Sequence, residues 1–201
     1  MLKIAVLASG RGSNLQSIIN SIEKGSLSAE IRIVVSDNKD AGALDKARKH
    51  NIAARFIDPA SYGSKSNYEK AIIKVFEEKG IDLVVMAGFM RILGKDFIEY
   101  YQGRIMNIHP SLLPSFPGLH AQRQALEYGV KYTGCTVHFA DQGMDTGPII
   151  LQAVVPIKDN DTEESLASRI LGKEHVIYPE AIRLYSENKL QVKGRKVIIK
   201  E

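Results

Sequence analysis

Several sequence features are scarce or missing, and each gap excludes a class of protein. The chain has one cysteine, Cys135, which rules out an intrachain disulfide, and its Cys and His residues lack the spacing of a zinc site. Residues 1–7 are too few for a secretory signal and include Lys3, and no apolar run of about 18 residues follows. We therefore expect a soluble, cytoplasmic protein without a metal or a membrane partner.

A strong charge bias is also missing. Lysine and arginine number 27 against 23 aspartates and glutamates, so the formal net charge is +4. This mild bias favours small anionic ligands and does not require a nucleic acid partner. Basic residues gather only near the C-terminus, which we interpret as a solvated tail: Lys189, Lys193, Arg195, Lys196 and Lys200.

Short runs rich in valine and isoleucine alternate with helical patterns. The runs typical of strands lie at residues 4–8, 31–36, 54–57, 83–87, 105–109, 133–139 and 149–155. Apolar residues at helical spacing lie at 15–22, 41–50 and 66–79. This alternation predicts an α/β fold: an open, mostly parallel, Rossmann-like sheet with helices on both faces and an antiparallel strand in the C-terminal part.

Two segments of the second half are predicted to be ordered loops. Three prolines make residues 110–118 non-helical, and residues 141–148 are polar and contain glycines. A helix should start at residues 161–164 and be kinked or interrupted by Pro179. We find no internal repeat, low-complexity tract or interdomain linker.

The turn after the first strand is a candidate anion site. Gly10-Arg11-Gly12-Ser13-Asn14 opens the first helix, where free N–H groups and the helix dipole can hold a phosphate, and Ser13 or Asn14 can cap the helix. A tight turn without a ligand is the alternative. Leu15 stands where a dinucleotide fingerprint has its third glycine, which favours a monophosphate, although Asp37 keeps a nicotinamide-dependent oxidoreductase open.

Asn107 and His109 lie two residues apart on the fifth predicted strand. Because side chains alternate along a strand, both point to one face. An amide and an imidazole can both donate to an oxyanion, as acyl transfer requires. Asp145, brought near His109, would favour the imidazolium and orient its ring. On these residues alone, a strand-end Asn and His are more often hydrogen-bonded structure than catalysts. A turn aspartate that bonds its own backbone is as good an interpretation of Asp145 as catalysis.

Three separate stretches together resemble the phosphoribosylglycinamide formyltransferase family. They are the turn at residues 10–15, Asn-Ile-His-Pro-Ser-Leu-Leu-Pro at 107–114, and Asp-x-Gly-x-Asp-x-Gly-Pro at 141–148. The resemblance covers residues 1 to about 187. It implies that Asn107, His109 and Asp145 are catalytic and that the ribonucleotide binds at Gly12, Ser13, Asn14 and Glu174.

The resemblance also implies a folate site. Its residues would be Met90, Arg91, Ile92 and Leu93, together with Asn107, Asp141, Gln142, Gly143, Met144 and Asp145, and Lys65, which departs from the arginine of bacterial relatives. Ordinary core residues are the alternative for Met90, Ile92 and Leu93. The implied domain is residues 1–188, with a phosphate-binding half of about 1–100 and a catalytic half of about 101–188, and a basic tail at 189–201 that can form a hairpin.

The implied reaction moves a formyl group from 10-formyltetrahydrofolate to the amine of phosphoribosylglycinamide in purine synthesis, without a metal. Its expected partners are these two small molecules, and protein partners are not predicted. Two relatives share the chemistry: methionyl-tRNA formyltransferase, with a C-terminal tRNA-binding domain, and formyltetrahydrofolate deformylase, with an N-terminal regulatory domain. We see neither extension in this sequence. A non-catalytic folate or phosphosugar binding module is a further alternative.

Overall fold

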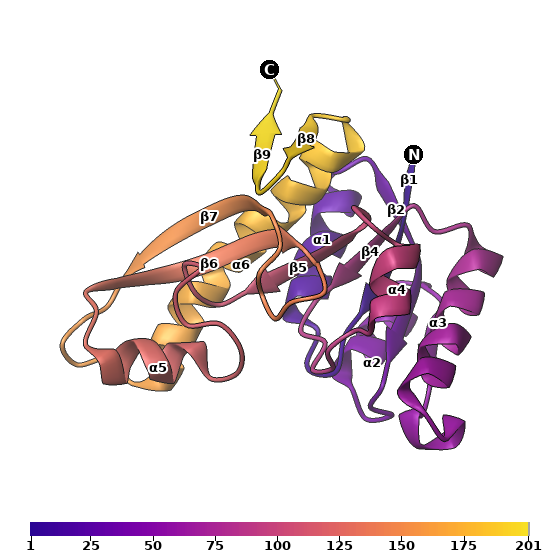
Figure 1. The fold of residues 1–201 in the computed structure, drawn as a ribbon, viewed down its shortest axis with the longest axis horizontal. Coiled ribbons are helices and arrows are strands. Elements are labelled where there is room, and N and C mark those ends of the chain that lie inside the picture. Colours follow the sequence, from indigo (N-terminus) through magenta and orange to yellow (C-terminus); the bar gives the residue numbers. More distant parts are fainter. Residues whose placement is uncertain (201) are drawn as a thin grey trace. The chain divides into compact units, whose positions relative to one another are not determined.

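A computed structural model describes residues 1–200 of the chain, which forms two compact units, 1–106 and 107–201 (Figure 1). No helix in the described part is long and apolar enough to cross a membrane. The chain passes from the first unit to the second inside one strand, β5 (Ile105–His109).

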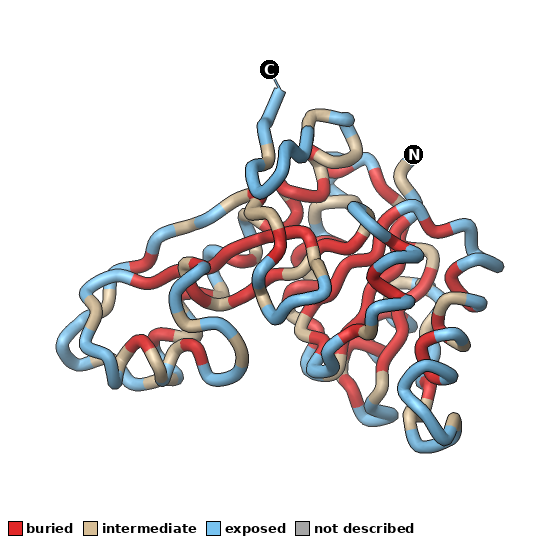
Figure 2. The backbone as a smooth tube through the Cα atoms, viewed as in Figure 1, coloured by how far each residue is buried: buried red, intermediate tan, exposed pale blue. Residues whose placement is uncertain are grey.

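The first unit is built on a parallel sheet. Its strands are β1 (Leu2–Leu7), β2 (Ala29–Ser36), β3 (Ala54–Phe56) and β4 (Leu83–Met86), in the order β3-β2-β1-β4. Neighbouring strands pair in parallel throughout. All of β4 and most of β1 are buried (Figure 2), which explains why these strands read as continuous apolar runs without alternation.

Helices cover both faces of this sheet. They are α1 (Ser13–Glu23), α2 (Gly42–Lys49), α3 (Lys65–Lys79) and α4 (Lys95–Tyr100), with a 3₁₀ turn, η1 (Pro59–Tyr62). The crossovers that contain α1 and α2 run outward from β1, whereas the one containing α3 returns across the sheet to β4. Because parallel crossovers are right-handed, this reversal places α3 on the face opposite α1 and α2. Helix α4 packs beside α3 (Figure 1).

The second unit combines strands of both directions with two helices. Strands β6 (Tyr132–Phe139) and β7 (Ile149–Pro156) pair antiparallel, and β8 (Leu190–Lys193) and β9 (Lys196–Ile199) form a C-terminal hairpin. Strand β9 joins β7 in parallel at Ile149 and Lys196. The helices are α5 (Ala121–Tyr128) and α6 (Glu163–Ser186), and α6 packs on β6 and β7.

The core of the second unit contains the single cysteine. Cys135 is fully buried and packs with Val155, Leu166 and Ile170. Burial raises the pKa of its thiol to about 12, so the sulfur is protonated and inert at neutral pH. Cys135 is therefore a structural core residue, and its thiol is not poised as a nucleophile.

The predicted fold class is confirmed, with corrections in the helices. Helix α6 starts as predicted, with a capping box between Thr162 and Ser165, but it continues through Pro179 to Ser186 without the predicted interruption. Pro179 is buried within this helix, so packing compensates for the lost backbone hydrogen bond. The short helices α4 and α5 were not predicted. They have six and eight residues, too few for a clear apolar period.

Candidate active site

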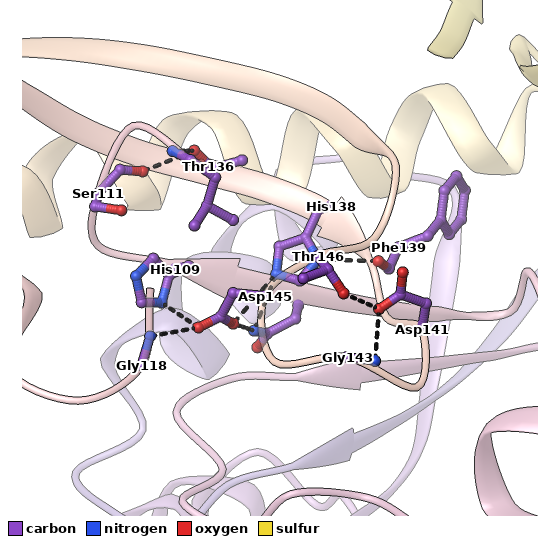
Figure 3. A network of polar contacts seen from close by, with 12 residues as sticks. His109, Ser111, Gly118, Thr136, His138, Phe139, Asp141, Gly143, Asp145 and Thr146 are labelled. Carbon is purple, nitrogen blue, oxygen red and sulfur yellow. Dashed lines mark hydrogen bonds and ion pairs between the residues drawn. The ribbon is translucent and has the colours of Figure 1, made fainter. Parts of the chain in front are cut away.

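The end of β5 carries the predicted catalytic pair into the second unit. His109 is 5% exposed, and Asn107 is half-buried two residues before it. The ring of His109 lies beside Asp145, whose carboxylate Oδ2 is 3.3 Å from Nδ1 (Figure 3). The other ring nitrogen, Nε2, donates to the carbonyl oxygen of Phe116 at 2.8 Å. Each nitrogen of this imidazole therefore faces an acceptor.

The protonation of His109 differs from the expectation. Burial lowers the pKa of His109 below its ordinary value, although the Phe116 carbonyl and the Asp145 carboxylate act in the opposite direction. Asp145 thus favours the imidazolium, as expected, but burial outweighs this contact and favours the neutral ring. The neutral ring keeps its proton on Nε2, because a carbonyl oxygen can only accept.

Asp145 is ionised, and its carboxylate accepts a hydrogen bond from the backbone. Burial raises its pKa, but contacts with His138, the Gly118 N–H and His109 outweigh burial and lower the pKa below the ordinary value. Gly118 donates its backbone N–H to Oδ2 at 2.8 Å (Figure 3). The Asp145 backbone has a φ of 56°, a left-handed conformation that costs a non-glycine residue about 1–2 kcal/mol.

A second histidine, His138, completes the cluster and was missed by the sequence reasoning. It is 2% exposed, and its Nδ1 donates to the carbonyl oxygen of Phe139 at 2.9 Å. Its Nε2 can then accept from Asn107 Nδ2, 3.2 Å away. Asn107 Nδ2 also lies 3.5 Å from Asp145 Oδ1, which is a weak contact. The signal available in the sequence was a polar residue one position before the end of β6, close to the predicted loop.

The loop at 141–148 is ordered by its own polar groups. Asp141 Oδ1 accepts from the Gly143 N–H at 3.0 Å and from Thr146 Oγ1 at 2.6 Å (Figure 3). At Gly147 a Cβ atom would lie 1.7 Å from the carbonyl oxygen of Phe139, so only glycine fits there. These constraints fix the path of the chain on both sides of Asp145.

The proline-rich loop after β5 is tied to β6. Thr136 Oγ1 donates to the Ser111 carbonyl at 2.7 Å and accepts from the Leu113 N–H at 3.0 Å. As predicted, the segment contains no helix. Between this loop and the 141–148 loop lies a cavity of about 350 Å³, lined by Leu113, Pro114, Pro117, Met144, Asp145, Thr146, Gly147, Ile149 and Arg195.

In the first unit, the predicted phosphate turn opens α1. Gly12 is the N-cap residue with a φ of 71°, and no side chain caps the helix, so the expected capping by Ser13 or Asn14 is wrong. A Cβ on Gly12 would lie 2.7 Å from Cα of Ala43, which explains the glycine. The start of an α-helix presents N–H groups and the positive end of the helix dipole, which suit an anion.

The predicted folate segment, also in the first unit, has an exposed apolar surface. Met90 is 66% and Ile92 is 58% exposed, whereas Leu93 is buried, so only Leu93 fits the alternative of ordinary core. Arg91 Nη1 lies 4.0 Å from Asp37 Oδ2, and the Arg91 guanidinium lies over the ring of Tyr68. Exposed large apolar side chains are typical of a binding surface.

Lys65 and Glu174 are the remaining residues with predicted binding roles. In the first unit, Lys65 Nζ is 3.9 Å from Glu69 Oε1. In the second unit, Glu174 is buried on α6. Among residues 1–200, no group of three or more His, Cys, Asp or Glu side chains is placed to hold a metal ion.

The family model described as "Formyl transferase" matches residues 2–182. The chain belongs to the formyltransferase family. It is 42% identical over 191 residues to the phosphoribosylglycinamide formyltransferase of Escherichia coli K12, covering 95% of this chain and 90% of that enzyme. The crystal structure of glycinamide ribonucleotide transformylase 1 from Symbiobacterium toebii is 49% identical with a TM-score of 0.99, covering 100% of this chain and 95% of that one.

Family members also occur within larger proteins. The chain is 46% identical over 191 residues to the trifunctional purine biosynthetic protein adenosine-3 of Gallus gallus, which covers 95% of this chain. This chain spans 19% of the length of that relative. Within this formyltransferase chain, the matched segment holds the Asn107, His109 and Asp145 cluster, and the C-terminal hairpin lies beyond it.

Proposed function

We propose that the chain transfers a formyl group from 10-formyltetrahydrofolate to the amine of N1-(5-phospho-D-ribosyl)glycinamide. The observation that carries this proposal is the contact of Asp145 with both His109 and Asn107, inside the segment that matches the formyltransferase family. The names of the relatives similar to this chain support the acceptor. The donor is the formyl folate implied by the sequence motifs.

In the proposed reaction, the acceptor amine attacks the formyl carbon and forms a tetrahedral oxyanion. Asn107 keeps one amide N–H on His138 and turns the other, now 3.5 Å from Asp145, to the oxyanion. His109 Nε2–H exchanges the neutral Phe116 carbonyl for the same oxyanion, since hydrogen bonds to charged acceptors are about twice as strong. Both donors gain strength only as charge develops, which lowers the barrier.

Protonation of His109 is proposed to accompany this step. Burial holds the ring neutral at first, and an anion formed beside it raises its pKa. The attacking amine loses a proton, His109 Nδ1 can hold it beside the Asp145 carboxylate, and the departing folate nitrogen takes up one proton as its bond to the formyl carbon breaks. No metal ion enters this scheme.

The binding roles are proposed from the motifs and from local geometry. Gly12, Ser13 and Asn14 would hold the phosphate at the start of α1, and Glu174 would contact the ribose or glycinamide. The proposed folate contacts are the exposed residues Met90, Arg91 and Ile92, the buried Leu93, and Asp141, Gln142, Gly143, Met144 and Asp145. Lys65 is a weaker candidate for the folate because its ammonium group already faces Glu69.

The test is an assay of purified protein with both substrates, beside a reaction without acceptor and one with methionyl-tRNA. Formylated ribonucleotide formed only with the phosphoribosyl acceptor supports the proposal. Formate release without acceptor would instead indicate a deformylase, and formylated tRNA a tRNA formyltransferase. Nicotinamide-dependent turnover would indicate an oxidoreductase, and binding of both ligands without transfer a binding module.

Site variants test the assigned roles. Asn107→Ala should lower kcat by about 10²- to 10³-fold, as loss of a preorganised oxyanion donor does elsewhere. His109→Ala and Asp145→Ala should also lower kcat strongly, while the affinity for the ribonucleotide changes little, because the phosphate turn belongs to the other unit. Full turnover in any of these variants would contradict its catalytic role.

A further inference from the structure

The C-terminal hairpin places a guanidinium against the loop that carries Asp145. Arg195 lies at the turn between β8 and β9, and its Nη2 donates to the carbonyl oxygen of Thr146 at 3.1 Å. The segment that matches the family model ends at residue 182, so this contact comes from outside it. Arg195 therefore makes a specific contact, which a purely solvated tail would not make.

The backbone at Asp145 needs such support. Its left-handed φ of 56° is unfavourable for a residue with a side chain, and such conformations persist only where surrounding contacts hold them. The Thr146 side chain is held by Asp141, and the Asp145 carboxylate by the Gly118 N–H. The Arg195 bond to the Thr146 carbonyl is a third tie, applied to the backbone directly after Asp145.

Side-chain packing alone does not hold the backbone next to Asp145 as the Arg195 hydrogen bond does. Asp145 and Thr146 line the 350 Å³ cavity, so on that side they are not closely packed. Arg195 lines the same cavity and donates to the loop at Thr146. The neighbouring Lys196 pairs with Ile149 at the start of β7, which joins the hairpin to the strand that follows the loop.

We propose that Arg195 is a positioning residue: it holds the Asp145 loop so that the carboxylate stays beside His109. This proposal rests on the proposed formyl transfer for its kinetic consequence, although the geometry itself does not depend on it. Arg195 touches no reacting atom in this scheme, so its loss should act on catalysis through Asp145.

The kinetic test compares Arg195→Ala, Arg195→Met and Arg195→Lys with the wild type. Lys193→Ala, which removes another exposed cation of the same hairpin, is the matched control. Loss of one hydrogen bond predicts a fall in kcat of about 2- to 12-fold for the Ala and Met variants. The KM values of both substrates should stay near wild type. The Lys variant keeps one donor and should recover part of kcat, and the control should match wild type.

A second readout separates positioning from general stability. The titratable groups that act on His109 are Asp145 and His138. If Asp145 moves away, His109 loses a favourable neighbour, and its pKa measured by NMR titration should fall further in Arg195→Ala than in Lys193→Ala. This measurement needs no turnover, so it tests the proposal even if the chain does not transfer formyl groups.

Two results would overturn the proposal. A rise in the KM of the formyl donor at unchanged kcat would make Arg195 a substrate-binding residue. Unchanged kcat together with an unchanged His109 titration in Arg195→Ala would show that the bond to Thr146 positions nothing. Should Arg195→Ala fail to fold, Arg195→Met and Arg195→Lys give the same comparison, because both keep the aliphatic stem in the cavity wall.

Discussion

Replacing Gly12 with alanine tests the phosphate turn, and a matched glycine makes the test quantitative. Gly12 and Gly25 have nearly the same left-handed φ, 71° and 74°. A Cβ on Gly12 would lie 2.7 Å from Cα and 2.9 Å from Cβ of Ala43, whereas a Cβ on Gly25 would meet nothing within 4 Å. The two positions therefore share a backbone cost and differ in the clash.

The magnitudes follow from these two contributions. A left-handed alanine costs about 1–2 kcal/mol, which is the whole expected loss for Gly25→Ala. Overpacking against Ala43 adds about 1–3 kcal/mol for Gly12→Ala. For a chain of this size, each kcal/mol lowers Tm by about 2–4 °C, so the Gly12 variant should melt about 2–12 °C below the Gly25 variant.

Thermal unfolding followed by circular dichroism measures the difference. Kinetics add a functional readout, since the clash should tilt the start of α1 and raise the KM of the phosphoribosyl acceptor in the Gly12 variant alone. Equal melting temperatures for the two variants would refute the close approach of Gly12 to Ala43. An unchanged acceptor KM in a folded Gly12→Ala protein would refute a phosphate site at this turn.

Three further predictions concern the second unit. The pKa of His109 in the folded chain is lower than the value of about 6.5 in the unfolded chain, so below pH 6.5 the unfolded chain binds more protons. Tm should therefore fall as the pH drops through this range. His109→Gln should make Tm less dependent on pH there, and an unchanged dependence would contradict the buried neutral ring. Because burial raises the pKa of Cys135 to about 12, a thiol reagent at neutral pH should modify it only after unfolding, and rapid labelling of the native protein would be incompatible with its burial. Thr136→Val strands the buried Leu113 N–H and should cost about 1–3 kcal/mol in thermal unfolding; a stability equal to wild type would show that this bond contributes nothing.

The sheet was predictable because its signal is local. Strands β1, β2 and β4 are short apolar runs that contain Val or Ile, and parallel strands buried on both faces need no partner to be recognised; β3, with the sequence Ala-Arg-Phe, is the exception. Helix α5 gave no such signal, since only Ala121 and Ala125 of its eight residues are buried. The predicted interruption at Pro179 did not occur. Burial of Pro179 in the packed unit offsets the lost backbone hydrogen bond, and this burial is not visible in the sequence.

The candidate site was predictable in its residues and less so in its chemistry. Period-two spacing placed Asn107 and His109 on one face, and the family motifs brought in Asp145; their catalytic roles stay predictions. The acceptor on His109 Nε2 was not predictable, because it is a backbone carbonyl of Phe116, in a left-handed conformation with a φ of 54°. The balance between burial and Asp145 that sets the charge of His109 depends on the packed structure.

The close backbone approaches in the second unit bear on how this sequence can evolve. A Cβ at Gly147 would sit 1.7 Å from the Phe139 carbonyl oxygen, and one at Gly134 would sit 1.9 Å from that of Ala153. Every substitution at these glycines therefore forces two strands or a loop apart, whatever its polarity. In a scan of all single substitutions under selection for growth, both positions should be as intolerant as His109, although neither glycine has a side chain to offer a substrate. Mutational intolerance in this chain would thus mark where backbones touch as well as where chemistry occurs.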